Sequence, residues 1–175
     1  MQNPAPYTLR WLTAADAAPF QALRLAALQE APWAFGSSYA EEKDQSLQQV
    51  ADRITPAAGR GIIGAWVGDR ADQLVGTLGL ARKTSAKQSH QAVIWGVYVA
   101  PHQRGQGMAQ AMLDQALQRA QQQDGLLQIH LGVTTSNTAA LRMYEGAGFR
   151  IYGTEPAALC VDGQLLDEYL MVRAV

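Results

Sequence analysis

The sequence predicts an α+β domain with a mixed, mostly antiparallel central sheet of six to seven strands and helices on both faces. Three observations lead to this prediction. The elements expected along the 175 residues follow the order β-α-α-β-β-β-α-β-α-β-β. Three strands in succession precede the first strand–helix–strand crossover, which favours antiparallel neighbours over a doubly wound parallel sheet. No linker-like segment divides the chain, so residues 1–175 are expected to form a single domain.

The first third of the chain predicts one strand and two helices. Residues 7–11 have the pattern of a short strand, and Asp16 is the expected N-cap of a helix that ends before Pro32. The stretch PWAFGSSYAEE, residues 32–42, is aromatic and then acidic and is expected to be a loop. Residues 46–54 predict the second helix because their apolar side chains recur at helical spacing.

Three strands and one long helix are expected in the middle of the chain. Residues 62–67 and 74–82 predict an antiparallel pair joined by the turn GDRAD. Residues 92–99 are apolar on both faces, so this strand should lie centrally in the sheet. Apolar residues then recur at the spacing of an amphipathic helix. They are Ala109, Met112, Leu113, Ala116, Leu117 and Ala120.

The C-terminal third predicts a strand, a short helix and a hairpin. The strand is expected over residues 126–133 and the helix over residues 138–145. The two hairpin strands, residues 149–160 and 164–172, meet at Asp162-Gly163, a dipeptide that favours tight turns.

Composition and charge exclude several classes of function. With 14 Lys and Arg against 15 Asp and Glu, the formal charge of −1 gives no electrostatic footprint for nucleic acid or an anionic membrane. No apolar run approaches the about 18 residues that a membrane span needs, no signal peptide is visible, and no His/Cys/Asp spacing suggests a metal. The single Cys160 lies in the apolar run AALCV and is expected to be buried. We therefore expect a cytoplasmic protein.

The segment PHQRGQGMAQAML, residues 101–113, places two glycines at the start of the predicted long helix. Glycine weakens a helix, but it adopts unusual dihedral angles and lets a large anion approach the backbone. Free N–H groups at a helix N-terminus carry partial positive charge and bind phosphates. The segment lacks the Lys-Ser or Lys-Thr pair of a P-loop and the glycine spacing of a dinucleotide-binding fingerprint. We expect it to bind a phosphate or pyrophosphate.

These residues resemble the GNAT family of N-acetyltransferases. Residues 104–109 read R-x-x-G-x-A between a strand and a helix, as in the coenzyme A pyrophosphate loop of that family. LGVTTSNTAALRMYEGAGF, residues 131–149, is similar to the family's next strand, its Asn-led helix and its Tyr-x-x-x-Gly-Phe ending. The segments LRLAALQEAPWAFGSSYAEE and GTEPAALCVDGQLLDEYLM resemble one bacterial branch, so the resemblance covers nearly the whole chain.

The resemblance implies the acyl-CoA N-acyltransferase fold and an acetyl-CoA-dependent N-acetyltransferase (EC 2.3.1.-) that needs no metal. A primary amine of a small molecule would attack the thioester directly, and Tyr144 would protonate the departing sulfur as general acid. Gly96 fits a strand bulge where the ligand adds hydrogen bonds. Asn137 and Tyr144 also have simpler interpretations, as a helix cap and as core. The implied cofactor-binding residues are Val97, Tyr98, Val99, Arg104, Gly105, Gln106, Gly107, Met108, Ala109, Asn137 and Tyr144.

The identity of the general base is left open by the sequence. Many family members carry a Glu on the strand before the loop, and Val93 stands there in this chain. Glu41, Glu42 and His130 are the candidates, together with His90 at the start of its strand. The two glutamates also fit a solvated helix start, and the histidine also fits a structural or solvated side chain.

The resemblance places the acceptor pocket between the loop 32–42 and the final hairpin. Trp33, Phe35 and Tyr39 would line it, although aromatic residues in loops are also common in satellite core clusters. Two alternatives stay open: acetylation of a protein N-terminus or lysine, and a non-catalytic acyl-CoA-binding regulatory domain. The expected partner is a small-molecule amine, with no nucleic acid and no membrane, and a homodimer is left open.

Overall fold

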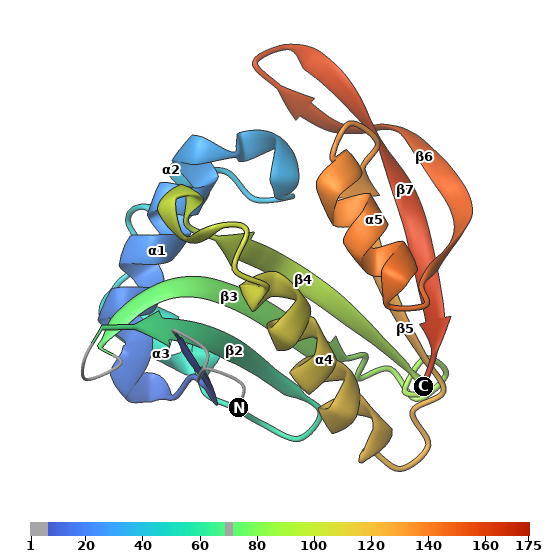
Figure 1. The fold of residues 1–175 in the computed structure, drawn as a ribbon, viewed down its shortest axis with the longest axis horizontal. Coiled ribbons are helices and arrows are strands. Elements are labelled where there is room, and N and C mark those ends of the chain that lie inside the picture. Colours follow the sequence, from blue (N-terminus) through green and yellow to red (C-terminus); the bar gives the residue numbers. More distant parts are fainter. Residues whose placement is uncertain (1–6, 69–71) are drawn as a thin grey trace.

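A seven-stranded sheet runs through the computed structural model, which describes residues 7–68 and 72–175 (Figure 1). The strand order is β1-β2-β3-β4-β5-β7-β6, and every neighbouring pair is antiparallel except β4 and β5. This confirms the predicted fold class, with β4 at the centre of the sheet. The strands are β1 (Thr8–Trp11), β2 (Arg60–Val67), β3 (Gln73–Arg82), β4 (Gln91–Val99), β5 (Gln128–Thr134), β6 (Arg150–Val161) and β7 (Gln164–Ala174).

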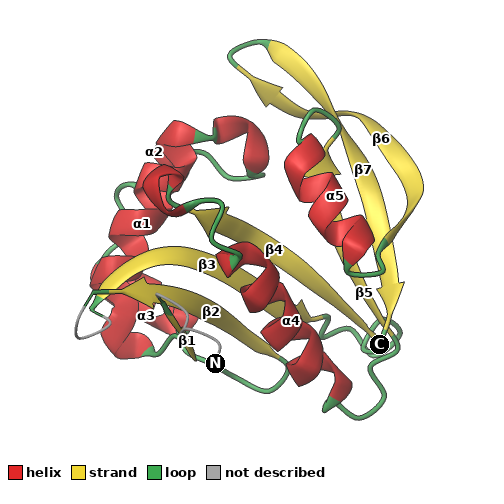
Figure 2. Cartoon of the chain, viewed as in Figure 1, coloured by secondary structure: helices red, strands yellow, loops and turns green. Residues whose placement is uncertain are grey.

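Helices cover both faces of this sheet (Figure 2). Side chains alternate between the faces of a strand, and β2 shows which helix covers which face. Ile62 packs in a cluster with residues of α1 and α3, whereas Ile63 packs in the cluster that contains the buried side of α4. The helices are α1 (Ala17–Glu30), α2 (Tyr39–Glu42), α3 (Leu47–Ile54), α4 (Met108–Gln121) and α5 (Thr138–Gly146), with short 3-10 helices η1 (Ala14–Asp16), η2 (Pro32–Ala34) and η3 (Pro101–Gln103). Within the described ranges no helix is long and apolar enough to cross a membrane.

The predicted loop 32–42 contains two short helices instead, η2 and α2. Helix α2 begins at a capping box, in which the Ser38 hydroxyl accepts a hydrogen bond from the Glu41 N–H and the Glu41 carboxylate accepts one from the Ser38 N–H. The pattern Ser-x-x-Glu was present in the sequence and indicates a helix start. Asp16 is the N-cap residue of α1, as predicted, but its carboxylate pairs with Arg10 at 2.7 Å and makes no cap hydrogen bond to α1.

The prediction that Cys160 is buried was wrong, because its side chain is exposed. Its apolar neighbours belong to β6, the edge strand, where the end of the hairpin extends beyond α5 (Figure 1). A register shift between Glu155 and Leu159 precedes Cys160, and Ala157 has a φ of 51° there. The predicted turn at Asp162-Gly163 is confirmed, whereas the turn GDRAD falls largely on residues 69–71, outside the described ranges.

The two parallel strands at the centre of the sheet are paired only at their first residues. Residues 91–93 of β4 face residues 128–130 of β5, and beyond them the strands diverge (Figure 1). Gly96 has a φ of 61° and lies at a register shift between β3 and β4, which confirms the predicted bulge. The Thr77 hydroxyl donates a hydrogen bond to the Gly96 carbonyl oxygen at 3.2 Å and holds the bulge in place.

Candidate active site

A cavity of about 460 Å³ occupies the space where β4 and β5 diverge. Its wall combines the bulged end of β4, the glycine loop before α4, the end of β5 and the inner side of α5. The segment that includes η2 closes one side. The glycine loop and the strand gap therefore open into one continuous cavity.

The loop before α4 presents its backbone to this cavity. Gly105 and Gly107 have φ values of 80° and 78°, a region that residues with a Cβ rarely adopt. Gly107 is the N-cap of α4, and no described side chain caps this helix end, so its first N–H groups stay free for an anion. Of the six residues 104–109 that are expected to bind the pyrophosphate, five line the cavity. The sixth is Gln106, whose side-chain amide donates a hydrogen bond to the Gln103 side chain at 2.9 Å.

Arg104 lines the cavity, but its guanidinium is already engaged. Its Nε donates to the Val99 carbonyl oxygen at 2.9 Å, and one terminal nitrogen pairs with Glu30 of α1 at 2.8 Å. Both partners of this ion pair are substantially exposed, so the pair itself contributes little to stability. Arg104 thus fixes the loop to the end of β4 and to α1.

Replacing Gly107 by Ala is expected to weaken acetyl-CoA binding roughly tenfold, which corresponds to about 1.4 kcal/mol. An added Cβ would lie 4.0 Å from the Tyr7 hydroxyl, so the cost comes from the positive φ and not from a clash. Titration calorimetry with acetyl-CoA measures the change. Gly163→Ala is the matched control, because Gly163 has a similar φ of 81°, lies outside the cavity and has open space where a Cβ would be added. Equal dissociation constants for both variants would contradict a role of the Gly107 backbone in binding.

Helix α5 brings two candidate residues to the opposite wall. Asn137 is the N-cap, and its side-chain oxygen accepts a hydrogen bond from the Ala140 N–H at 3.2 Å. Its amide N–H₂ can still donate into the cavity that Asn137 lines, so capping and ligand binding are compatible. Tyr144 is 5% exposed, lines the cavity and packs edge-on against Phe149. Burial raises the pKa of Tyr144, so its hydroxyl keeps its proton at neutral pH.

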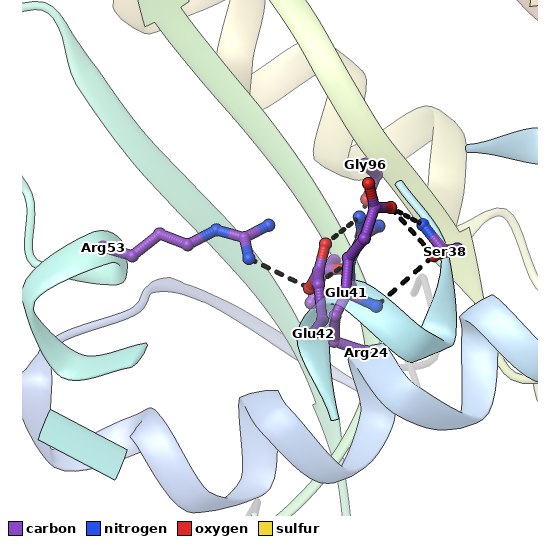
Figure 3. Close-up of polar contacts among 7 residues, drawn as sticks. Arg24, Ser38, Glu41, Glu42, Arg53 and Gly96 are labelled. Carbon is purple, nitrogen blue, oxygen red and sulfur yellow. Dashed lines mark hydrogen bonds and ion pairs between the residues drawn. The ribbon is translucent and has the colours of Figure 1, made fainter. Parts of the chain in front are cut away.

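Hydrogen bonds and ion pairs hold the two acidic candidates for the general base (Figure 3), and neither residue lines the cavity. The Glu41 carboxylate accepts hydrogen bonds from the Ser38 N–H and hydroxyl, which lower its pKa. Glu42 is 5% exposed and pairs with Arg24 at 2.7 Å and with Arg53 at 2.9 Å. Burial acts to raise the pKa of Glu42, but the hydrogen bonds from the two arginines outweigh it and hold the pKa at about 2.

His130 lies beneath the point where the strands begin to diverge, in register with Val93 of β4. Its ring packs edge-on against Tyr152 at 5.7 Å, and its Nε2 atom is enclosed without a hydrogen-bond partner among the described residues. Burial, followed by the charges of Lys83 and His90, lowers the pKa of His130. His130 is not part of the cavity wall.

The aromatic residues expected around the acceptor separate into different environments. Trp33 lines the cavity and is 38% exposed, and η2, which contains it, contacts both β5 and β6. Phe35 is buried in the core beside Tyr98, with 6.2 Å between the ring centroids. Tyr39 is exposed on α2 and lies outside the cavity wall.

Thr134 is a cavity residue that no sequence motif indicated. It is 3% exposed, and its hydroxyl has no hydrogen-bond partner within residues 7–68 and 72–175. A buried hydroxyl without a partner is costly, and this one lies on the wall of a cavity that a polar ligand could fill. No local pattern distinguishes it from the neighbouring threonine and serine in TTSN.

Comparisons with known proteins agree with this geometry. Residues 23–149 match the model of the acetyltransferase (GNAT) family. The structure is similar to a GNAT-family acetyltransferase from Streptococcus pneumoniae, with a TM-score of 0.84, 20% identity, and coverage of 97% of this chain and 99% of that one. It is also similar to a GNAT-superfamily phosphinothricin acetyltransferase from Sinorhizobium meliloti in complex with acetyl-CoA, with a TM-score of 0.78, 21% identity, and coverage of 97% and 89%.

A sequence match extends the comparison to N-acetyltransferase 8B of Rattus norvegicus, at 34% identity over 91 residues. That match covers 51% of this chain and 40% of the length of the rat protein. A family model that spans residues 23–149, together with a fold shared over nearly the whole chain, defines the class. The chain belongs to the GNAT family of acetyltransferases.

Proposed function

We propose that this protein transfers the acetyl group of acetyl-CoA to a primary amine of a small molecule. The observation that carries the proposal is the continuity of the cavity, which joins the free N–H groups of α4 to the gap between β4 and β5. A diphosphate fits the first part, and an extended chain that offers hydrogen bonds to the strand edge fits the second. The Sinorhizobium meliloti relative, which was solved with acetyl-CoA, supports this choice of donor.

The residues of the cavity fit the cofactor part by part. The backbone from Arg104 to Ala109 would hold the diphosphate, and the residues of β4 beyond Gly96 would hydrogen-bond the pantetheine arm. Asn137 and the unpartnered hydroxyl of Thr134 supply further polar contacts. When bound, acetyl-CoA supplies a thioester, whose carbonyl carbon bonds to the amine nitrogen while the C–S bond breaks and coenzyme A leaves as a thiol.

Two groups of the chain act on the reacting atoms in this proposal. A backbone N–H near Val97 donates to the carbonyl oxygen as negative charge develops there. The Tyr144 hydroxyl, which is buried and protonated, gives its proton to the sulfur. A protonated acid inside the cavity favours an enzyme over a domain that only binds acyl-CoA.

The segment η2 beside the cavity favours a small acceptor. Contacts of η2 with β5 and β6 close the acceptor side, where a protein lysine or N-terminus would need an open groove. Trp33 gives this side an apolar wall.

Calorimetry followed by a thiol-release assay tests the proposal. Acetyl-CoA is titrated into the folded protein, and thiol release is then followed with L-methionine, spermidine, 2-phenylethylamine and a lysine-containing peptide. We expect acetyl-CoA binding and thiol release with at least one small amine. The absence of coenzyme A binding would overturn the donor assignment. Binding without release from any amine would identify a regulatory domain, and preference for the peptide would identify a macromolecular acceptor.

A further inference from the structure

Glu168 is a half-buried carboxylate of β7 that has no role in the chemistry described so far. It is the cross-strand partner of Thr134 on β5, so the two side chains lie on the same face of the sheet. One carboxylate oxygen lies 2.9 Å from the point where a Cβ of Gly132 would stand. Gly132 and Thr134 both line the cavity, and Gly132 is exposed. The Glu168 carboxylate therefore lies beside Gly132, a residue of the cavity wall, and Glu168 itself is not one of the residues that line the cavity.

No cation among the described residues pairs with Glu168. Within the described ranges it takes part in no salt bridge or side-chain hydrogen bond, in contrast to the doubly paired Glu42. On the adjacent β6 its cross-strand partner is Glu155, and on β5 the titratable side chain of the same face is His130. The segment η2 carries no charged residue. Burial, and then the negative charge of Glu155, raise the pKa of Glu168.

We propose that Glu168 is the general base of the reaction and the group that binds the ammonium of a cationic primary amine. This inference rests on the proposed acetyl transfer. The carboxylate first pairs with the ammonium and then takes one proton from it, so that an R–NH₃⁺ becomes R–NH₂ with a free lone pair. The carboxylic acid returns this proton to solvent. When the amide forms, the amine nitrogen loses a second proton. This loss balances the proton that the sulfur gains.

The position of Glu168 suits this role better than those of the other candidates. The carboxylate of Glu41 is held by Ser38, that of Glu42 is held by two arginines, and the Nε2 atom of His130 is enclosed away from the cavity wall. Within the described residues Glu168 makes no such contact, and its carboxylate occupies the space that a side chain at Gly132 of the cavity wall would fill. A carboxylate with a raised pKa also holds a proton better than an ordinary surface carboxylate, as a general base must.

Glu168→Gln tests the proposal with each amine of the panel that supports thiol release in the wild type. We expect kcat/KM for the amine to fall about 100-fold or more at pH 7, while the dissociation constant for acetyl-CoA changes less than about twofold. The remaining activity should rise with pH toward the pKa of the free amine, because only amine that is already deprotonated reacts. Glu168→Asp keeps a carboxylate and should recover part of the activity. It should also recover the acid limb of the pH profile, which is the fall in activity at low pH as the carboxylate becomes protonated.

Glu155→Gln is the matched control, because it removes the neighbouring carboxylate of the same face. We expect activity within about threefold of the wild type and an acid limb that moves to lower pH, since the negative neighbour no longer raises the pKa of Glu168. A Glu168→Gln enzyme that keeps its activity within threefold and its acid limb would overturn the inference and leave acetyl transfer intact. The inference would also be overturned if His130→Asn lost the activity while Glu168→Gln kept it. If the wild type binds acetyl-CoA but acetylates no amine, the proposed function fails and the base assignment falls with it.

Discussion

Replacing Tyr144 by Phe is expected to lower kcat about 100-fold and to change the dissociation constant for acetyl-CoA by less than threefold. The hydroxyl is the proposed proton donor to the sulfur, and a positioned acid contributes about 10²–10⁴-fold to a rate. The ring keeps its edge-on packing against Phe149, and the hydroxyl makes no side-chain hydrogen bond to another described residue, so the fold should tolerate the change. Steady-state thiol release and calorimetry measure the two effects separately.

Tyr152→Phe is the matched control for this experiment. Tyr152 lies on β6, is exposed and stands outside the cavity wall, so the loss of its hydroxyl should leave kcat unchanged. Because burial raises the pKa of Tyr144, the wild type should also show no alkaline decline from this group below about pH 10. If Tyr144→Phe keeps the wild-type kcat, then water and not Tyr144 protonates the sulfur.

Replacing Glu42 by Gln is expected to lower the free energy of unfolding by about 3 kcal/mol. The change leaves two arginines near the core without their shared carboxylate, which ties α2 to α1 and α3 (Figure 3). For a chain of this size such a loss corresponds to a fall in Tm of roughly 6–12 °C. Thermal and urea unfolding measure the change at pH 7.

The difference in the free energy of unfolding between wild type and Glu42→Gln depends on pH, because the pKa of Glu42 is lowered in the folded protein. The folded value of about 2 lies below the ordinary 4.5, so the stabilisation is complete above about pH 5 and is lost as the pH falls toward 2. The gap in stability between wild type and Glu42→Gln should therefore narrow in acid. Glu41→Gln, at the exposed neighbouring position, should have a much smaller effect at pH 7. Equal losses for the two variants would show that the buried ion pairs do not anchor α2.

Much of the fold was predictable because its signals are local. Apolar residues on both faces of the strand placed β4 at the centre of the sheet, and helical spacing identified the buried side of α4. Gly96 and the pair Asp162-Gly163 predicted a bulge and a turn, since each signal depends on the dihedral angles of one or two residues. Helix α2 had an equally local signal in its capping box, which the acidic and aromatic composition of the loop obscured.

Other predictions depended on neighbours that the local sequence does not contain. The run around Cys160 is apolar, but exposure is decided by what lies against a strand, and this part of the hairpin extends beyond the helices. Glu42 looked like a solvated helix start, yet α1 and α3 bring it one arginine each. In both cases the missing information was the identity of residues far away in the chain.

The sequence by itself determined the order of the strands and of the longer helices, the glycine loop that opens α4 and the family to which the chain belongs. The tertiary structure alone decided which polar groups meet at the cavity. Thr134 and Glu168 are adjacent only because β5 pairs with β7 in one particular register, and the Glu168 carboxylate can lie beside Gly132 of the cavity wall only because that residue has no side chain. Pairing between distant strands is set by the packing of the whole sheet, so no local pattern around Glu168 announces its position.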